Sequence, residues 1–242
     1  MASLFSEARS VSTGHPRLNA ASIALSPNLG YDVSVGPSVD TRTRLLDAAV
    51  HLIETKGEVG LRVRDVASMA KVTEPSIYHF FGSREGLIVA AQALRYVQGQ
   101  VKGLRVFEAS VYACTSKKQF IELVRSALRD LYENPQSADT RAVRINVLGS
   151  AQSRPELARQ LAEMQRVANK ALAEPLAFAQ DKGWVRKGVN LEMLSAWIIG
   201  QINGRVLLEI DPTLTDTATW DNISIDAVLA AMGNPPTSLK TP

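Results

Sequence analysis

Hydrophobic residues recur at helical spacing along most of the chain between residues 41 and 233. The first predicted helix runs from about Thr41 to Lys56, and Gly57 is expected to end it. One face of this helix carries an apolar stripe made of Leu45, Leu46, Ala49, Val50 and Ile53. No segment shows the sustained alternation of apolar and polar residues that is typical of a β-strand. The pattern therefore predicts an all-α protein.

Two short helices separated by a tight turn follow the first helix. One spans about Val63 to Ala70, and Lys71 and Val72 leave room for only a tight connection before the next. Thr73 is predicted to cap the second short helix with its hydroxyl group, and Pro75 suits a first turn because proline lacks an N–H. Helix, tight turn and second helix form the helix-turn-helix pattern, which places the second helix in the major groove of DNA.

The polar residues around this second helix are the candidates for contacting DNA. Thr73, Glu74 and Ser76 would face base edges, whereas Tyr78 and His79 would donate to phosphates. Arginines that open the neighbouring helices would also contact phosphates, although each could equally be a solvated surface residue. Tyr78 could instead be a half-buried core residue, and His79 a plain surface histidine. The predicted DNA-binding residues are Arg42, Arg62, Arg64, Thr73, Glu74, Pro75, Ser76, Tyr78, His79, Ser83 and Arg84.

The segment VRDVASMAKVTEPSIYHFFGSREGL resembles the signature of the TetR (tetracycline repressor) family of bacterial regulators. The matching positions are Val66-Ala67, Thr73, Tyr78, Phe81 and the run Gly82-Ser83-Arg84-Glu85 followed by Leu87. Lys71 stands where the family has a turn glycine, so a left-handed backbone is expected there without glycine's freedom. Arg62 replaces the usual threonine cap. The resemblance covers about residues 41 to 95.

The resemblance implies a function and a domain organisation. It implies a homodimeric repressor that binds a pseudo-palindromic double-stranded DNA operator and is released by a small-molecule effector. The expected order is a disordered arm (1–40), a helix-turn-helix DNA-binding domain (41–90), a helical-bundle domain for effector binding and dimerisation (91–233) and a loose tail (234–242).

Six further helices are expected after the helix-turn-helix. Pro175 should kink or split the longest of them. Their predicted ranges are about 84–104, 117–132, 140–149, 154–182, 191–210 and 223–232.

Candidate residues for the dimer interface and the effector pocket come from the later helices. Small and apolar residues spaced by four could pair with a second subunit, although packing within one chain explains them as well. They are Leu194, Ile198, Gly200, Ile202 and Gly204. The candidate pocket residues, each of which could instead be core or surface, are Phe107, Tyr112, Phe120, Arg144, Met164, Phe178 and Trp197. Arg141 and Arg144 lie one turn apart and would admit an anionic ligand or form a solvated face.

Composition narrows the class of protein without naming it. The hydrophobic fraction of 45% is ordinary for a globular chain, and a net charge of +3 does not by itself predict nucleic-acid binding. No apolar run reaches about 18 residues, so no membrane association is expected. One cysteine, Cys114, cannot form an internal disulfide, which fits a reducing cytoplasm.

Two other functions compete with DNA-binding regulation. An enzyme would need a catalytic constellation, but the three histidines are far apart and Cys114 has no identifiable histidine partner. No metal site or cofactor is expected. A helical interaction module with a purely structural helix-turn-helix would favour apolar residues where Thr73, Glu74 and Ser76 stand.

Overall fold

The computed structural model of the protein describes residues 40–97, 100–211, 213 and 216–233. Within these residues every regular element is an α-helix, which confirms the all-α prediction. Apart from Asp40, the predicted arm and the predicted tail lie outside the described residues. In the ranges given above, no helix combines the length and apolarity that a membrane span requires.

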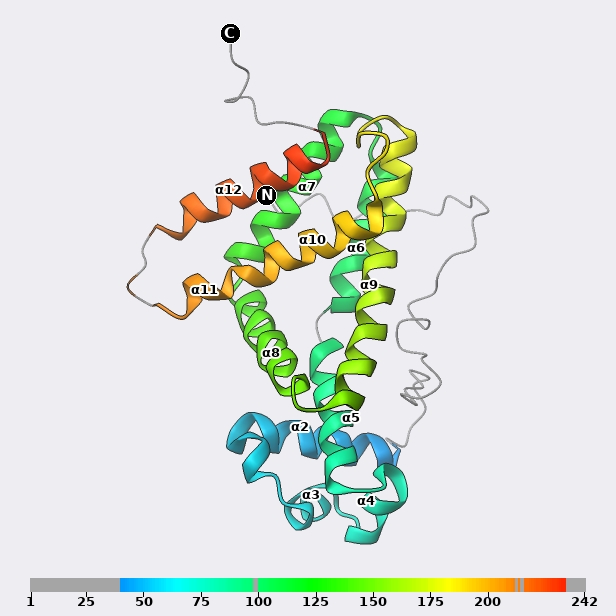
Figure 1. Cartoon of the computed structure of the whole chain (residues 1–242), viewed down its shortest axis with the longest axis vertical. Coiled ribbons are helices and arrows are strands. Elements are labelled where there is room, and N and C mark those ends of the chain that lie inside the picture. Colours follow the sequence, from blue (N-terminus) through cyan, green and yellow to red (C-terminus); the bar gives the residue numbers. More distant parts are fainter. Residues whose placement is uncertain (1–39, 98–99, 212, 214–215, 234–242) are drawn as a thin grey trace. The chain divides into compact units, whose positions relative to one another are not determined.

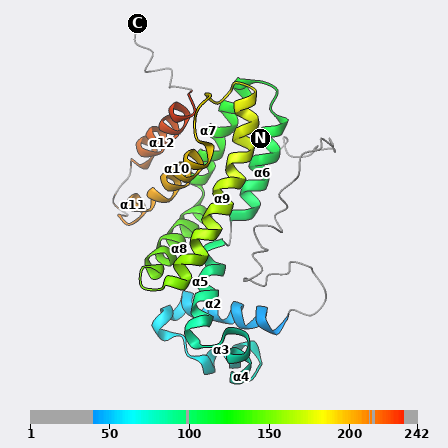
Figure 2. The same cartoon turned by 45° about the vertical axis from the view of Figure 1, so that its right-hand side comes forward.

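Helices α2, α3 and α4 gather at one end of the described residues, and α5 leads from them into the remaining helices (Figures 1 and 2). We refer to α2–α4 as the head and to the helices after α5 as the body. In the body, α9 packs against α5, α6, α8 and α10, while α12 packs mainly against α7. In chain order the helices are α2 (Thr41–Gly60), α3 (Val63–Ala70), α4 (Glu74–Phe81), α5 (Arg84–Val97), α6 (Gln100–Ala113), α7 (Lys117–Glu133), α8 (Pro135–Ala151), α9 (Pro155–Asp181), α10 (Leu191–Gly204), α11 (Val206–Glu209) and α12 (Thr217–Ala231).

The helix boundaries agree with the prediction in the head and depart from it in the body. In α2, Gly57 takes non-helical angles (φ 70°, ψ 169°), so regular helix ends where predicted and one more turn follows. The predicted helix over 84–104 is instead α5 and α6, with residues 98 and 99 outside the described residues. Pro175 lies inside α9 without splitting it. The predicted helix over 191–210 is interrupted at Arg205.

Side-chain caps fix where several body helices begin. Asn134 accepts a hydrogen bond from the backbone N–H of Gln136 at 2.9 Å, and α8 therefore starts five residues before its predicted position, at Pro135. Asp216 accepts from the N–H of Thr219 at 3.1 Å and starts α12 at Thr217. The last helix is therefore longer than the predicted range of 223–232.

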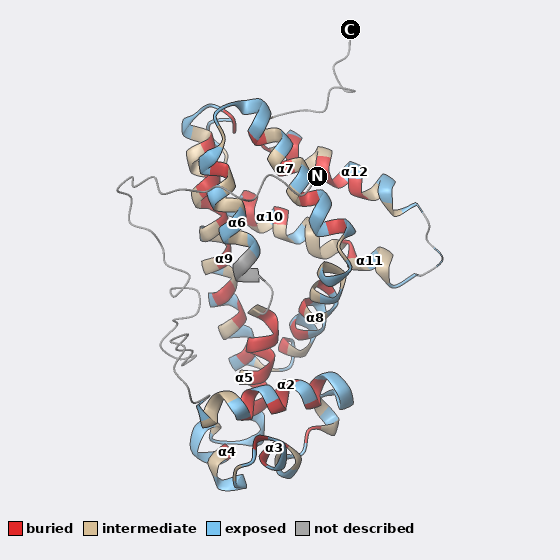
Figure 3. Cartoon of the chain, turned by 180° about the vertical axis from the view of Figure 1, so that it is seen from behind, coloured by how far each residue is buried: buried red, intermediate tan, exposed pale blue. Residues whose placement is uncertain are grey.

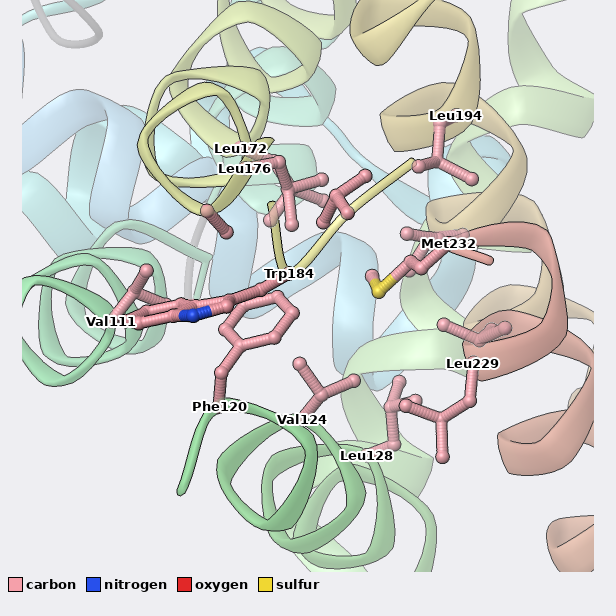
Figure 4. Close-up of a cluster of buried hydrophobic side chains, with 14 of the residues drawn as sticks. Val111, Phe120, Val124, Leu128, Leu172, Leu176, Trp184, Leu194, Leu229 and Met232 are labelled. Carbon is pink, nitrogen blue, oxygen red and sulfur yellow. The ribbon is translucent and has the colours of Figure 1, made fainter. Parts of the chain in front are cut away.

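One apolar core fills the centre of the body. Side chains of α6, α7, α9, α10 and α12 meet there, with Phe120 and Trp184 ring centroids 5.8 Å apart (Figure 4). Leu194 and Ile198 belong to this core and are buried within the chain. The prediction that these two residues face a second subunit is therefore wrong, and the alternative of packing within one chain holds for them.

A buried ionic cluster joins α8, α11 and α12 beside this core. Arg205 donates to both carboxylate oxygens of Asp221, at 2.6 and 3.0 Å. Arg141, which is buried, pairs with Glu209, and Arg205 also donates to Glu209 at 2.9 Å. Burial disfavours the charged form of Glu209, but the hydrogen bonds from Arg141 and Arg205 outweigh it and hold the pKa of Glu209 below its usual value.

The approach of α4 to α5 leaves no room for a side chain at Gly86. A Cβ atom there would lie 2.1 Å from the carbonyl oxygen of Phe81. Gly86→Ala should therefore lower the free energy of unfolding by at least about 1–3 kcal/mol, because backbone would have to move. Thermal unfolding followed by circular dichroism measures this.

Gly103→Ala is the matched control for that substitution. A Cβ at Gly103 meets nothing within 4 Å, and Gly103 lies in α6, so alanine should raise stability by about 0.5–1 kcal/mol. A Gly86→Ala protein as stable as the parent would contradict the close backbone approach.

The lowered pKa of Glu209 predicts acid sensitivity. Between the folded and unfolded pKa values the native carboxylate binds fewer protons than the unfolded chain, so stability falls as pH drops below about 4.3. Glu209→Gln should cost about 1–3 kcal/mol at pH 7, because it weakens the charge-assisted hydrogen bonds from Arg141 and Arg205. Its loss of stability between pH 5 and pH 3 should be shallower than that of the parent in urea titrations.

Glu163→Gln serves as the control, because Glu163 forms an exposed ion pair with Arg166. Parallel pH profiles for the parent and Glu209→Gln would show that Glu209 does not contribute to the acid response.

Candidate nucleic-acid interface

The turn between α3 and α4 has the geometry that the sequence predicts. Lys71 takes a left-handed backbone conformation (φ 55°, ψ 48°) although it is not glycine. Its N–H donates to the carbonyl of Ser68 at 3.2 Å, and the N–H of Val72 donates to the carbonyl of Ala67 at 3.0 Å. These bonds satisfy the end of α3 and turn the chain sharply. The prediction for Lys71 is confirmed.

The start of α4 differs from the prediction in one detail. Thr73 has the extended backbone of a capping residue, but its side chain makes no capping hydrogen bond. Its hydroxyl lies 3.3 Å from the hydroxyl of Ser76 instead. Pro75 occupies the first turn as predicted. The exposed start of α4 therefore offers backbone N–H groups and hydroxyls in a region of positive helix-dipole potential, which favours anionic groups.

The faces of α4 are clearly divided. Ile77 is fully buried and holds α4 to the rest of the head. Tyr78 is 51% exposed, and His79 is exposed beside it, so both lie on the outer face. Phe80 is 37% exposed and stacks edge-on against His79, with ring centroids 5.0 Å apart. Phe81 is half-buried, and the guanidinium carbon of Arg42 lies over its ring, 5.4 Å from the ring centroid.

The predicted basic residues of the head fall into two groups. Arg62 and Arg64 are exposed, and Arg64 lies 3.9 Å from Asp65. Arg84 instead acts within the fold, donating to the carbonyl of Leu61 at 2.9 Å and to that of Glu58 at 2.8 Å. Its contact with phosphate stays a prediction beside this structural role.

Two further residues, Lys71 and Ser83, lie just before and just after α4. The hydroxyl of Ser83 accepts from the N–H of Gly86 at 2.9 Å, so Ser83 caps α5. Lys71 is exposed at the turn that leads into α4, and the sequence analysis did not include it among the candidates. Its position in the tight turn could have marked it as a candidate for contacting DNA, because side chains of that turn lie next to the start of the second helix.

A polar junction joins the head to the body. Glu58, after the break in α2, accepts from the hydroxyl of Ser150 at 2.6 Å, pairs with Arg154 at 2.7 Å and also accepts from Gln92. Arg154 reaches on to Glu85 at 2.6 Å. Burial opposes ionisation of Glu58, but the hydrogen bonds and the charge of Arg154 outweigh it and lower the pKa of Glu58.

The predicted pocket residues do not line one cavity. Phe120 is fully buried in the body core, so the prediction that it lines a pocket is wrong. Tyr112 and Phe178 pack edge to face with centroids 5.2 Å apart, Phe107 packs against the core, Met164 is buried and Trp197 is exposed.

A cleft of about 580 Å³ lies elsewhere, between α8, α9 and α10. Of the predicted residues, Arg144 contacts two of its lining side chains, those of Tyr96 and Gln165.

Comparison with known proteins identifies the head. Residues 45–91 match the family described as "Bacterial regulatory proteins, tetR family". The HTH-type transcriptional repressor AcnR of Corynebacterium efficiens is 24% identical over 166 residues, which cover 69% of this chain and 80% of AcnR. The HTH-type transcriptional regulator UidR of Escherichia coli is 23% identical over 171 residues, which cover 71% of this chain and 82% of UidR.

Solved structures show the same fold. A TetR-family regulator from Cytophaga hutchinsonii superposes with a TM-score of 0.58 at 17% identity, covering 83% of this chain and 99% of that chain. FadR from Bacillus subtilis, solved in complex with stearoyl-CoA, gives 0.53 at 18% identity, covering 78% and 97%. The matched head, the relatives along most of the chain and the exposed second helix of the helix-turn-helix lead to one conclusion: this chain is a DNA-binding transcriptional regulator of the TetR family.

Proposed function

We propose that the protein is a homodimeric, cytoplasmic repressor that leaves its operator when a small molecule binds the body. The observation that carries the DNA-binding part is the outer face of α4, where polar groups are exposed while Ile77 anchors the helix from behind. The proposed domains are residues 41–90 for DNA binding and 91–233 for effector binding and dimerisation. Repression is proposed because the relative AcnR is a transcriptional repressor by name.

Each residue at the interface has a proposed role. Thr73, Glu74 and Ser76 contact base edges, and Pro75 holds the first turn of α4 in helical geometry. Tyr78 and His79 donate to phosphates, because they stand on the exposed side of α4 beyond its first turn. The proposed phosphate contacts from outside α4 are Arg42, Arg62, Arg64, Ser83 and Arg84, and we add Lys71 because it is exposed at the turn before α4.

A second subunit is proposed to cover the outer surface of α10, α11 and α12. Exposed apolar side chains lie on each of these elements: Met193 and Trp197 on α10, Leu207 on α11 and Ile223 on α12. Exposed apolar side chains on neighbouring elements are typical of subunit interfaces. Gly200, Ile202 and Gly204 are partly or fully exposed and remain proposed interface residues. Two copies of α4 held about 34–36 Å apart would then read two half-sites of a pseudo-palindrome.

The effector is proposed to act through α5, which passes from the head into the body. Gln92 of α5 donates to Glu58 in the head, and Tyr96, one turn further on, lines the body cleft. A ligand that favours one position of α5 over another therefore changes the separation of the two α4 helices.

The DNA-binding roles can be tested by substitution in α4. Tyr78→Ala should weaken binding about tenfold to every duplex, because a phosphate contact carries no sequence information. Ser76→Ala should instead change the preference at particular base pairs. Selection of duplexes from a random pool, followed by fluorescence anisotropy on the selected sequence and on a scrambled one, separates the two effects.

His51→Ala provides the control, because His51 is an exposed residue of α2 outside the proposed interface. Unchanged affinity in Tyr78→Ala would remove the phosphate role of Tyr78. A parent protein that binds no duplex at low salt would overturn the proposed function itself.

A further inference from the structure

Arg144 of α8 is a buried cation that has no carboxylate partner among the described residues. Its side chain is 8% exposed and lies over the ring of Tyr96, with the guanidinium carbon 4.7 Å from the ring centroid. One terminal nitrogen donates to the Tyr96 hydroxyl at 3.1 Å and to the Gln165 side-chain oxygen at 3.3 Å. The Nε of Arg144 is buried and has no hydrogen-bond partner among the described residues.

The other buried arginines of the described chain all have a carboxylate nearby. Arg141 pairs with Glu209, Arg205 pairs with Asp221, and Arg95 lies 3.5 Å from Glu54. No such ion pair involves Arg144 within the part of the chain that the structure describes. Burying a charge without a counter-ion is unfavourable, and contact with an aromatic ring offsets only part of that cost. The site therefore favours an anion from outside the chain.

The cleft between α8, α9 and α10 lies next to this cation and is separated from it by two side chains. Tyr96 and Gln165, the two side chains to which Arg144 donates, both line the cleft. The rest of the lining is largely apolar and includes Leu148, Leu161 and Ile199. A volume of about 580 Å³ falls in the range of pockets that hold small organic ligands. The cleft thus has a largely apolar lining with a polar part at Tyr96 and Gln165, and Arg144 lies directly behind these two side chains.

We propose that this cleft binds a small molecule with an apolar body and one carboxylate group, and that this molecule is the effector. The carboxylate would accept hydrogen bonds from the Tyr96 hydroxyl and from Arg144, replacing the Gln165 oxygen as the acceptor, and the apolar body would lie against α8, α9 and α10. The assignment rests on the proposed function. Because Tyr96 is a residue of α5, the helix that follows α4, ligand contact at the cleft acts directly on the connection to the head.

Isothermal titration calorimetry on the full chain tests the ligand class. The probes are octanoate, decanoate and 4-phenylbutyrate, with 1-decanol as an uncharged counterpart of decanoate. At least one carboxylate should bind, and 1-decanol should bind at least about tenfold more weakly than decanoate. Binding of 1-decanol as tight as that of decanoate, or no binding of any carboxylate, overturns the proposal.

Substitutions locate the site. Arg144→Met should weaken carboxylate binding by about tenfold or more, Arg144→Lys should restore part of it, and exposed Arg166→Gln on α9 should leave it unchanged. Ala158→Leu on α9 narrows the cleft at a residue that the proposed subunit interface does not include. It should also weaken carboxylate binding, and it keeps the site testable if Arg144→Met does not fold. Full affinity in both Ala158→Leu and folded Arg144→Met overturns the site.

DNA binding separates this inference from the proposed function. On a duplex selected by the parent protein, the carboxylate that binds should lower DNA affinity in the parent and not in Arg144→Met. Carboxylate binding without any change in DNA affinity overturns the effector assignment. DNA binding with no carboxylate response overturns the inference and leaves the regulator standing, whereas failure to bind any duplex overturns the proposed function independently.

Discussion

Burial of α5 on nearly all sides is the constraint on which the rest of the structure depends. Most of this helix is inaccessible to solvent (Figure 3). It packs against α2 and α4 in the head and against α8 and α9 in the body. A helix that is buried all round cannot move without repacking its neighbours, because protein interiors are densely packed. The orientation of α4 is therefore linked to the packing of the body.

Three buried polar residues of α5 make specific polar contacts with neighbouring helices. Gln92 reaches Glu58 in the head, and Arg95 lies between Glu54 and Asn146, at 3.5 and 3.4 Å. Tyr96 reaches Gln165 on α9 at 2.6 Å. Buried polar groups are costly unless they are hydrogen-bonded, so such contacts select particular arrangements of the helices. A ligand that takes one of these hydrogen bonds alters the balance between arrangements.

The two buried arginines of α8 show how similar residues acquire different roles. Arg141 and Arg144 stand one turn apart, and both are buried. Arg141 pairs with Glu209 of α11, whereas the partners of Arg144 within the described ranges are the hydroxyl and ring of Tyr96 and the amide oxygen of Gln165. The first arginine is satisfied by the fold, and the second leaves charge available to a ligand. Spacing along the helix could not distinguish them, because the partners lie far away in sequence.

The sequence by itself determined the head. Gly57, the turn at Lys71-Val72, Pro75 and the Ser83 cap are local signals that act within a few residues, so the helices and their order follow from them. Tertiary structure decided the body. Leu194 and Ile198 face the chain's own core, and the cleft forms where α8, α9 and α10 meet. In the head, too, Arg84 donates to the carbonyl of Leu61 at the end of α2, a contact between residues far apart in the sequence. Which face of an amphipathic helix meets which neighbour depends on contacts between distant residues, and a single sequence read locally does not contain them.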